Sequence, residues 1–563
     1  MSVVPARAIR LRSSRENLIA QALIILLAAW LALTVLFPLS ALLSKSFRDV
    51  SGAFVGFANY AAYFSNRTLA ASIGNSLAIA LATTAITVPL AYVYAYALTR
   101  SAMHGKTVFR ALALIPILAP SLLPALSLIY LFGNQGLLKG LLFGHTIYGP
   151  LGVVAAEVFH CFPHALMILV TALTLADQRL YEVAQSLGTS KPRTFLTITL
   201  PGSKYGLMSA AFVVFTLTVT DFGAPKVIGG NFDVLATDIY KQVIGQQNFE
   251  IGAVVGMVLI IPALIAFIVD RAVQRRQVAL LSARAIPYAP RPAPLFDWTM
   301  FAFCGVIALL VTGVLAVAAF GSLVKFWPYN LELTLANYEF ARHDADGWSS
   351  YWNSLRMAGW TAVTGTVLVF CGAYLIEKTR GSQALRAIAH MLALLPLAVP
   401  GLVLGLGYIF FFNHPDNPLG FIYGTLAILV INTTAHFYTV CHLTAVTALK
   451  QLDAEFEAVS ASLKVPFWRT FRRVTVPLCL PAVLDISVYL FVNAMTTVSS
   501  VIFLYSAETK LAAVAVVNMD DASKTAPAAA MAMMIFYTSA ALRMVHAALT
   551  RGVMRRTQAW RRQ

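Results

Sequence analysis

The sequence predicts an all-α membrane protein in which about twelve spanning helices form two homologous halves. Of its 563 residues, 59% are hydrophobic and only 12% are charged, and the mean hydropathy is +0.75. A soluble domain carries about 25% charged residues. Apolar runs of about 20 residues, each long enough to cross about 30 Å of hydrocarbon as a helix, recur along the whole chain. The core of the protein is therefore expected to lie in lipid.

Twelve apolar runs qualify as spans, and the loops between them differ in charge. If the N-terminus is cytosolic, most of the 41 lysines and arginines fall in cytosolic segments, as the positive-inside rule requires. This distribution explains the net charge of +17 better than nucleic-acid binding does. The predicted spans are 18–44, 71–98, 108–132, 151–174, 206–224, 252–270, 299–323, 354–376, 387–412, 421–446, 480–504 and 526–548.

Both ends of the chain are expected in the cytosol. Residues 1–17 form a basic tail, and residues 549–563 form another on the same side. The run after the first tail is too long for the core of a signal peptide, so we interpret it as an uncleaved first span. The five cysteines have no metal-ligand spacing and are expected to be small core residues. The arginines of the first tail are Arg7, Arg10, Arg12 and Arg15.

The chain repeats itself at an offset of 275–280 residues. Asn75-Ser76-Leu77 opens the second span and Asn353-Ser354-Leu355 the eighth, while Ile147-Tyr148-Gly149 matches Ile422-Tyr423-Gly424. Six spans per half is an even number, so both halves cross the membrane in the same direction. They are expected to be parallel repeats about an axis along the membrane normal.

The repeat sets the expected domain limits. The first half covers 18–270 and the second covers 299–548. Residues 271–298 are rich first in arginine and then in proline, which fits a stiff cytosolic linker.

Prolines recur within the third and ninth spans. Pro116 and Pro120 correspond to Pro396 and Pro400. Proline removes a backbone hydrogen bond, so both spans are expected to be kinked. The kinks could permit rocking of the halves or could serve static packing.

Two amphipathic loops occupy matching positions, 175–205 in the first half and 450–479 in the second. In the first loop, residues 182–187 can form a short helix that Gly188 ends in a left-handed conformation. Lys191-Pro192 can begin a second short helix. A single loop of this kind is usually an interfacial helix, but a matched pair favours a symmetric partner on the water side.

The first loop resembles the EAA motif of the membrane subunits of binding-protein-dependent ABC importers, Glu-x-Ala-x3-Gly-x9-Ile-x-Leu-Pro. The position of the loop, between the fourth and fifth spans of a six-span half, is also that of the family. The resemblance covers both halves. The matching residues are Glu182, Ala184, Gly188, Ile198, Leu200 and Pro201.

The second loop departs from this motif. Ala458 stands in place of the glutamate, Lys464 in place of the glycine, and Val476 in place of the leucine. This loop is also expected to dock, but the geometry of its hinge stays open. Its candidate docking residues are Glu457, Ala458, Leu463, Lys464 and Pro477.

The resemblance implies a type I importer permease with both halves fused in one chain, in the bacterial inner membrane. Its loops would couple to cytosolic ABC ATPase subunits, expected as a homodimer, and a periplasmic binding protein would deliver the solute. Gly105-Lys106-Thr107 lacks the upstream glycine of a Walker A loop. ATP hydrolysis is therefore expected on another chain, and no enzymatic activity, cofactor or metal site is expected on this one.

The solute is suggested by resemblance alone. Residues 125–136, 237–247 and 518–521 resemble segments of 2-aminoethylphosphonate permeases. Iron(III), thiamine and polyamines remain alternatives within the same class. An ion-coupled secondary transporter and a non-transporting scaffold are the rivals from other classes.

Ionisable residues within spans are costly and need an explanation. Glu157, His160 and His164 share one face of the fourth span, and His436 corresponds to His160 at an offset of 276. Asp221 ends the fifth span. These five residues are candidates to line a translocation path, although a polar seam between helices explains them as well. Lys226 and Lys241, just beyond Asp221, could attract an anion or be ordinary loop charges.

Overall fold

The structure is a computed structural model that describes residues 15–279, 286, 288–379, 382–453 and 455–557. Most of the predicted N-terminal tail, with Arg7, Arg10 and Arg12, lies outside these residues, as do residues 280–285 and 287 of the linker and the end of the C-terminal tail. The described chain is mainly helical with almost no strand, as predicted. Its strands are β1 (Val324–Phe326) and β2 (Asn330–Leu333), which pair as an antiparallel hairpin.

Thirteen α-helices belong to each half among the described residues, and the last helix of the first half and the first helix of the second extend into the predicted linker from its two ends. The first set is α1 (Arg15–Leu31), α2 (Phe37–Ser46), α3 (Ala58–Ser65), α4 (Arg67–Arg100), α5 (Lys106–Ala113), α6 (Leu122–Phe132), α7 (Pro150–Thr174), α8 (Gln178–Ser186), α9 (Lys191–Thr194), α10 (Leu200–Thr220), α11 (Gly223–Ile228), α12 (Leu235–Tyr240) and α13 (Phe249–Ala279). The second set is α14 (Pro294–Leu323), α15 (Ser349–Trp360), α16 (Thr366–Lys378), α17 (Gln383–Leu394), α18 (Gly401–Phe412), α19 (Leu426–His436), α20 (Tyr438–Lys450), α21 (Glu455–Ser462), α22 (Phe467–Thr470), α23 (Val476–Leu478), α24 (Leu480–Thr496), α25 (Ala512–Asp521) and α26 (Thr525–Thr557).

Eight stretches among the described residues are helical, long and apolar enough to cross a membrane. Four further pairs of helices qualify together but bend between their members, by 100° at α5–α6, 112° at α17–α18, 54° at α19–α20 and 78° from α22–α23 to α24. Counting each pair as one span gives twelve, in agreement with the prediction.

The two sharpest bends lie at the predicted proline positions. Ala119 and Val399, each followed by proline, have extended backbone conformations (ψ 140° and 117°). The ring of a following proline disfavours the helical region, and proline offers no N–H to continue the helix. The kinks expected at Pro120 and Pro400 are therefore complete breaks between two helices.

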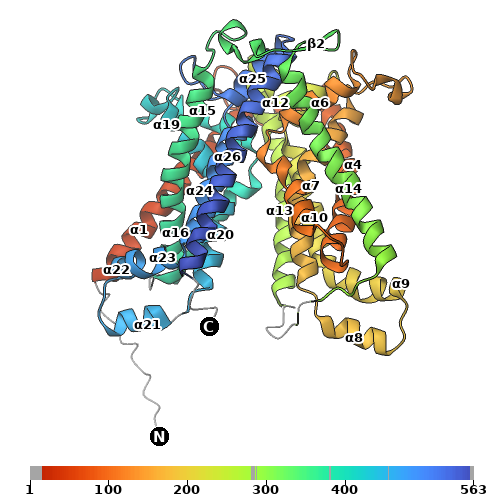
Figure 1. The fold of residues 1–563 in the computed structure, drawn as a ribbon. Helices are drawn as coiled ribbons and strands as arrows, with labels where there is room; N and C mark the ends of the chain where they lie inside the picture. The colour runs from red at the N-terminus through yellow and green to blue at the C-terminus, as the bar shows by residue number, and fades with distance from the viewer. Residues whose placement is uncertain (1–14, 280–285, 287, 380–381, 454, 558–563) are drawn as a thin grey trace.

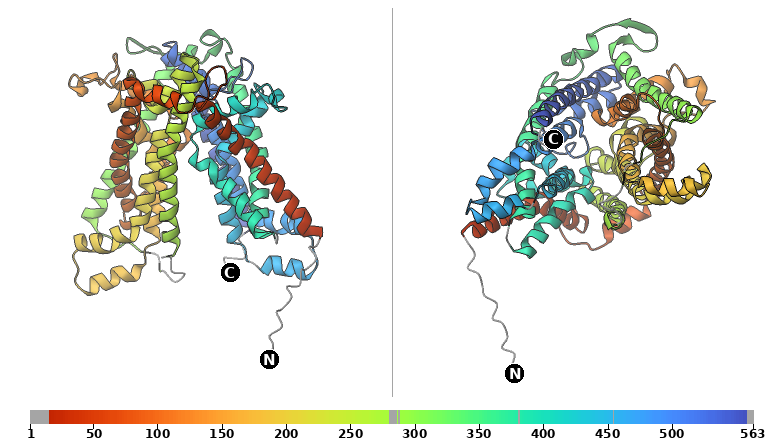
Figure 2. Two further views of the ribbon diagram at one scale, coloured as in Figure 1. Left: turned by 180° about the vertical axis from the view of Figure 1, so that it is seen from behind. Right: turned by 60° about the horizontal axis from the view of Figure 1, so that its bottom comes forward.

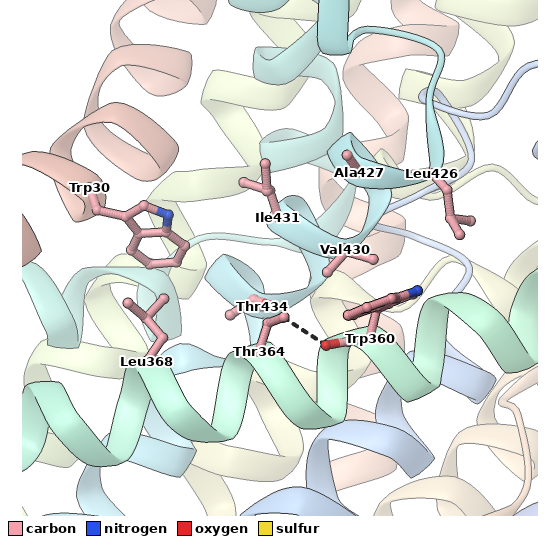
Figure 3. Close-up of a pocket in the computed structure, with 9 residues that line it drawn as sticks. All are labelled: Trp30, Trp360, Thr364, Leu368, Leu426, Ala427, Val430, Ile431 and Thr434. Carbon is pink, nitrogen blue, oxygen red and sulfur yellow. Dashed lines mark hydrogen bonds between the residues drawn. The ribbon is translucent and has the colours of Figure 1, made fainter.

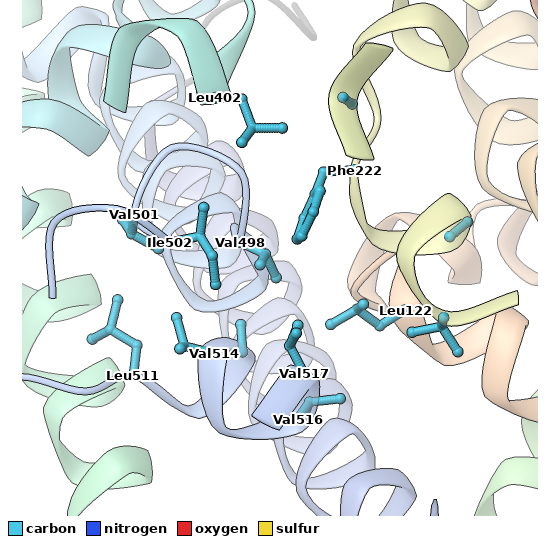
Figure 4. Close-up of a cluster of buried hydrophobic side chains, with 14 of the residues drawn as sticks. Leu122, Phe222, Leu402, Val498, Val501, Ile502, Leu511, Val514, Val516 and Val517 are labelled. Carbon is cyan, nitrogen blue, oxygen red and sulfur yellow. The ribbon is translucent and has the colours of Figure 1, made fainter. Parts of the chain in front are cut away.

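The helices form two limbs that meet at one end and diverge toward the other (Figure 1). The short helices α8 and α21 lie at the free ends of the two limbs. A continuous cluster of buried apolar side chains fills the joined end. There Leu122 and Phe222 of the first half face Val498 and Val517 of the second (Figure 4).

The first span of each half packs on the opposite half (Figure 2). Ile24 and Leu27 of α1 share a core cluster with Val369 and Ala373 of α16. In the same way, α14 lies against α4, α5 and α6 of the first half. The halves are thus interlocked at the level of whole helices, which the repeat in the sequence did not predict.

Candidate functional site

The first loop is a helix followed by a tight stop, as its sequence predicts. The expected second short helix is wrong, because the helix that begins at Lys191 continues through Pro201 into α10 as one stretch, Lys191–Thr220. Asp177 caps α8 by accepting a hydrogen bond from the Arg179 N–H at 3.1 Å. At the other end Gly188 has φ +63°. The Thr189 N–H donates to the Ala184 carbonyl at 2.9 Å, and the Gly188 N–H donates to the Gln185 carbonyl at 3.0 Å. This pair of bonds is the Schellman arrangement, which requires a left-handed residue at its centre.

The second loop reaches the same geometry with a different residue. Lys464 stands where the first loop has Gly188 and has φ +52°. The Val465 N–H donates to the Ser460 carbonyl at 2.9 Å, which corresponds to the bond from Thr189 to Ala184. The second loop therefore keeps the hinge geometry that its sequence alone did not determine. It is strained, because a side chain at Cβ disfavours this backbone region.

Both short helices expose an apolar face at their free ends. Leu180, Val183 and Leu187 are all more than half exposed on the first loop, and Leu187 reaches 76%. The second loop repeats the i, i+3, i+7 spacing 276 residues later with Phe456, Val459 and Leu463. We call these two sets the apolar triplets. Spacing of this kind places three side chains on one helix face, and such an exposed face marks a surface for a partner.

Arg100, at the end of α4, holds the first short helix in place. Its guanidinium donates to the Leu173 carbonyl at 2.7 Å. It also lies over the rings of Tyr288 and Tyr181, at 4.5 and 5.3 Å from their centroids. Tyr181 belongs to α8, and its hydroxyl bonds with Thr199 at 3.1 Å. A buried cation between two aromatic faces fixes the angle at which α8 leaves the limb.

The second short helix is held by an ion pair instead. Lys378, at the end of α16, contacts Glu457 with an N–O distance of 3.1 Å. Glu457 lies 276 residues after Tyr181 and so occupies the same position on its helix. A cation from the end of the second span of each half thus meets the same place on each short helix, through an aromatic ring in one half and a carboxylate in the other.

The described part of the linker runs along α8. The Gln178 N–H donates to the Ile286 carbonyl at 2.9 Å, and the Gln178 side chain accepts from the Ala289 N–H at 2.9 Å. Arg291 donates to Gln185 at 2.8 Å. These contacts have no counterpart on α21 among the described residues.

The motif residues separate into buried and exposed positions. Glu182 is exposed and accepts a hydrogen bond from Gln178 at 3.1 Å, whereas Ala184 is buried against the limb. Ile198 and Leu200 are half-buried, while Pro201, Ala458 and Pro477 are exposed. Ser460 corresponds to Ala184 at the offset of 276 and is only half-buried, which is consistent with the weaker motif match of the second loop.

Three of the five candidate path residues come together. Glu157 is fully buried, lies within hydrogen-bonding reach of Asp221, and accepts a bond from the Cys161 thiol at 3.7 Å. His160 lies near enough to the same Asp221 carboxylate to interact with it electrostatically. Asp221 also caps α11 by accepting from the Ala224 N–H at 2.9 Å. The described residues contain no group of histidine, cysteine and acidic side chains arranged to hold a metal.

Of the other two candidates, His164 adjoins this group and His436 belongs to the other half. His164 is one turn further along α7, and its Nδ1 lies 3.3 Å from the His160 carbonyl. His436 ends α19 in the second half, and its Nδ1 has no hydrogen-bond partner among the described residues. The polar cluster is therefore a feature of the first half, not a symmetric pair.

The sequence analysis missed a symmetric contact beside this cluster. In the first half, a Cβ placed on Gly223 would lie 2.3 Å from the Ser121 hydroxyl oxygen. In the second half, a Cβ on Gly401 would lie 2.6 Å from the Ser499 hydroxyl oxygen. Gly401 corresponds to Ser121 and Ser499 to Gly223, so serine and glycine have exchanged places. A residue-by-residue alignment of the two halves would have shown this exchange of serine and glycine.

The two loop lysines flagged by the sequence are both paired. Lys226 contacts Asp521 of the opposite half at 2.8 Å, across the joined end. Lys241 contacts Asp233 at 2.5 Å. Neither is a free cation in this structure.

A cavity of about 570 Å³ opens between α1, α15, α16 and α19 (Figure 3). Its walls are apolar apart from Thr364 and Thr434, and the Thr364 hydroxyl is satisfied by the Trp360 carbonyl at 2.7 Å. Such a cavity offers no charged or directional recognition of a polar solute, and it is lined by none of the five candidate path residues.

Comparison with known proteins matches both halves to one family. The family of binding-protein-dependent transport system inner membrane components aligns with residues 87–278 and again with 365–555. Each match includes one of the two loops.

Individual relatives span both halves. A ferric transport system permease of Actinobacillus pleuropneumoniae is 30% identical over 441 residues, which cover 75% of this chain and 63% of that protein. A protein of Haemophilus influenzae that is provisionally named a ferric transport system permease is 30% identical over 434 residues, covering 74% and 68%. A spermidine/putrescine permease homologue of Mycoplasma genitalium is 30% identical over 169 residues, covering 30% and 57%. The matched region thus spans about two thirds of the length of the ferric permeases.

Proposed function

The chain belongs to the family of inner membrane components of binding-protein-dependent transport systems, and from that premise we propose that it is the fused permease subunit of an ATP-driven importer. The observation that carries the proposal is the pair of apolar triplets, exposed at matching positions on the free ends of the two limbs. Both belong to loops with the same backbone geometry. Two equivalent surfaces favour two equivalent partners.

We propose that those partners are the two subunits of a cytosolic ABC ATPase homodimer. Each would receive one short helix in a groove lined by apolar side chains. This places α8, α21 and both chain termini in the cytosol, as the distribution of basic residues also favours. In this assignment residues 18–270 and 299–548 are the two permease halves, and 271–298 is a cytosolic linker.

The joined end would then face the periplasm and receive the binding protein. A structure closed at that end and open between the limbs corresponds to an inward-facing state. Closure of the ATPase dimer would draw the free ends together and separate Leu122 and Phe222 from Val498 and Val517. Rupture of the Lys226–Asp521 ion pair would accompany this opening.

We propose that Glu157, His160 and Asp221 line the path at its outer third, with His436 opposite and His164 one turn deeper. Their support is the convergence of ionisable side chains inside spans, where each is costly. A structural seam would leave transport unchanged when Glu157 is replaced by glutamine. A path residue would change the uptake rate without changing ATPase binding.

Two solute classes are favoured by different observations. The names of the relatives that span both halves favour ferric iron. The resemblance of three segments to 2-aminoethylphosphonate permeases favours that phosphonate. We propose a small polar solute delivered by a binding protein, and uptake of labelled ferric iron, 2-aminoethylphosphonate, thiamine and spermidine in a strain lacking this chain decides which.

The test of the mechanism is reconstitution of the full chain with its ATPase and binding protein in proteoliposomes. Uptake that requires internal ATP, and that disappears when the triplets are altered, supports the importer. Uptake by the chain alone in ATP-free vesicles, driven by an ion gradient, would support the secondary transporter instead.

A further inference from the structure

A second cavity, of about 410 Å³, lies at the end of α4 and α7 beside the first loop. Three cations line it, namely Arg100, Lys106 and Arg110, and no acidic side chain does. Leu98 and Val170 form an apolar part of its wall, where the spans end. Neither Lys106 nor Arg110 forms an ion pair within the described residues. The cavity is therefore a concentrated positive site at the edge of the membrane.

Arg100 is the deepest of these cations. Its residue is only 6% exposed, and its Nε has no hydrogen-bond partner among the described residues. No carboxylate pairs with its guanidinium within the described residues, where its hydrogen-bond partners are the Leu173 carbonyl and the Tyr181 hydroxyl. Asp297, which accepts the backbone N–H groups of Ala102 and Ala293 at 2.7 and 2.8 Å, interacts electrostatically with Lys106 and His104 but forms no ion pair with them. A buried cation with an unused donor, and without a carboxylate, calls for an anion.

The start of α5 adds backbone donors to the same cavity. Gly105 has φ +74° and precedes the helix without a side-chain cap. Lys106 and Thr107 follow it and line the cavity. The first N–H groups of a helix have no partner within the helix, and together with the helix dipole they favour a phosphate. The Gly-Lys-Thr fragment, which fails as a Walker A loop, thus contributes to an anion site of another kind.

The second half does not repeat this site. Arg386 corresponds to Lys106 and donates to the carbonyls of Ile376 and, at 3.2 Å, Glu377. His390 corresponds to Arg110, and its Nδ1 lies 3.1 Å from the Nε2 of His442. In the second half these positions are engaged by the protein itself, whereas in the first half they face a cavity.

We propose that this cavity binds the phosphate of an anionic phospholipid headgroup. The chemistry that it recognises is a phosphate, and the lipid source is favoured because the cations sit beside apolar side chains at the ends of two spans. Basic pockets between spanning helices on the cytosolic side bind anionic lipid headgroups. The proposal rests on the proposed orientation only for the leaflet that supplies the lipid. Because Arg100 also holds Tyr181, a bound phosphate would stabilise the first loop.

The test uses the purified full-length chain without ATPase, ATP or solute, so its failure is independent of the importer proposal. The chain is stripped of lipid in detergent, and binding of phosphatidylglycerol, phosphatidylcholine and inorganic phosphate is measured by native mass spectrometry and by the shift in melting temperature. The variants are Lys106→Ala, Arg110→Ala and the double substitution. Lys450→Ala removes an exposed cation elsewhere at the same end and serves as the matched control.

We expect each single substitution to weaken phosphatidylglycerol binding about fivefold and the pair about thirtyfold, with no change for Lys450→Ala. Lys106→Arg keeps the charge and should keep binding, which separates loss of the site from loss of folding. Equal binding of phosphatidylglycerol and phosphatidylcholine, unaffected by either alanine, would overturn the proposal. Competition by inorganic phosphate as strong as that by the lipid would overturn the lipid source and leave a soluble phosphate as the ligand.

Discussion

The two coupling loops have one shape and two chemistries. The first has glycine at the left-handed position and a cation held between tyrosine rings, whereas the second has Lys464 and an ion pair between Lys378 and Glu457. The first is also tied to the linker. The apolar triplets, in contrast, keep both their spacing and their exposure. The surface that meets the partner is thus alike in the two halves, while the scaffold beneath it differs.

The comparison indicates that the two loops need equivalent contact surfaces but not equivalent supporting contacts. A partner with two equal grooves would contact only the apolar triplets, and its binding would depend on the angle of each short helix. Any set of supporting contacts that fixes this angle is therefore sufficient for binding. The sequence motif records one such scaffold, so a loop that departs from the motif can keep the geometry that the motif describes.

The largest expected effect tests whether both loops dock. Leu187→Asp and Leu463→Asp each replace a leucine that the ATPase would cover with a charged side chain. Each should weaken ATPase binding on the order of 100-fold. Co-purification and ATP-dependent uptake measure this. Leu295→Asp, which alters a highly exposed leucine outside both triplets, is the control. Loss with the first variant alone would break the equivalence of the loops.

The next effect compares the two scaffolds. Arg100→Ala removes a buried hydrogen bond and two cation–aromatic contacts, and it should destabilise the first loop by about 3 kcal/mol. Lys378→Ala breaks a partly exposed ion pair and should destabilise the second by about 1 kcal/mol. Hydrogen exchange of the α8 and α21 amides reports each loop separately. Equal effects would show that the two anchors are interchangeable in strength.

The next expected effect concerns the joined end. Raising the pH through about 6 is expected to destabilise this end of the molecule without affecting either coupling loop. Burial raises the pKa of Asp520 to about 6, aided by the adjacent Asp521 and opposed by Lys226. The protonated form therefore contributes stability that is present below about pH 4 and is lost as pH rises through about 6. Asp520→Asn should raise the free energy of unfolding by about 2 kcal/mol at pH 7 and have little effect at pH 4. Thermal melting across this range measures it, and a gain that is equal at both pH values would contradict it.

The smallest effect lies at the hinges themselves. Lys464→Gly removes the strain of a lysine with left-handed backbone and should stabilise the second loop by about 1 kcal/mol. Gly188→Lys introduces the same strain and should destabilise the first loop by about 1 kcal/mol. Hydrogen exchange of the Thr189 and Val465 amides measures both. An opposite sign at either position would mean that the lysine side chain makes a stabilising contact in the assembled importer.

Much of the fold followed from simple features of the sequence. Hydrophobic runs predicted twelve spans, and Pro120 and Pro400 predicted where two of them change direction. The bend after Phe437 has no proline at the break and could not be predicted in this way. The left-handed backbone of Lys464 was equally hidden, because it is set by the loop and not by the preference of lysine.

The parts of the candidate site that depend on one short segment of sequence could be predicted. The Gly188 turn and the exposed helix face follow from spacing within one segment. The contact of Glu157 with Asp221 joins two spans whose relative rotation no periodicity specifies. The exchange of α1 and α14 between halves was hidden for a similar reason, since one apolar helix can pack on many others.

That exchange has a consequence for how the protein is made. The helices on either side of the linker, α13 and α14, lie on the same limb (Figure 1), so the linker joins neighbours and spans no gap. A chain cut there would give two pieces, each with a first helix that packs wholly or partly on the other piece, since α1 lies against α16 and α17 while α14 lies against α4, α5 and α6 as well as α26. Each fragment alone would leave apolar helix surface without its partner, and the covalent join supplies both halves in equal number.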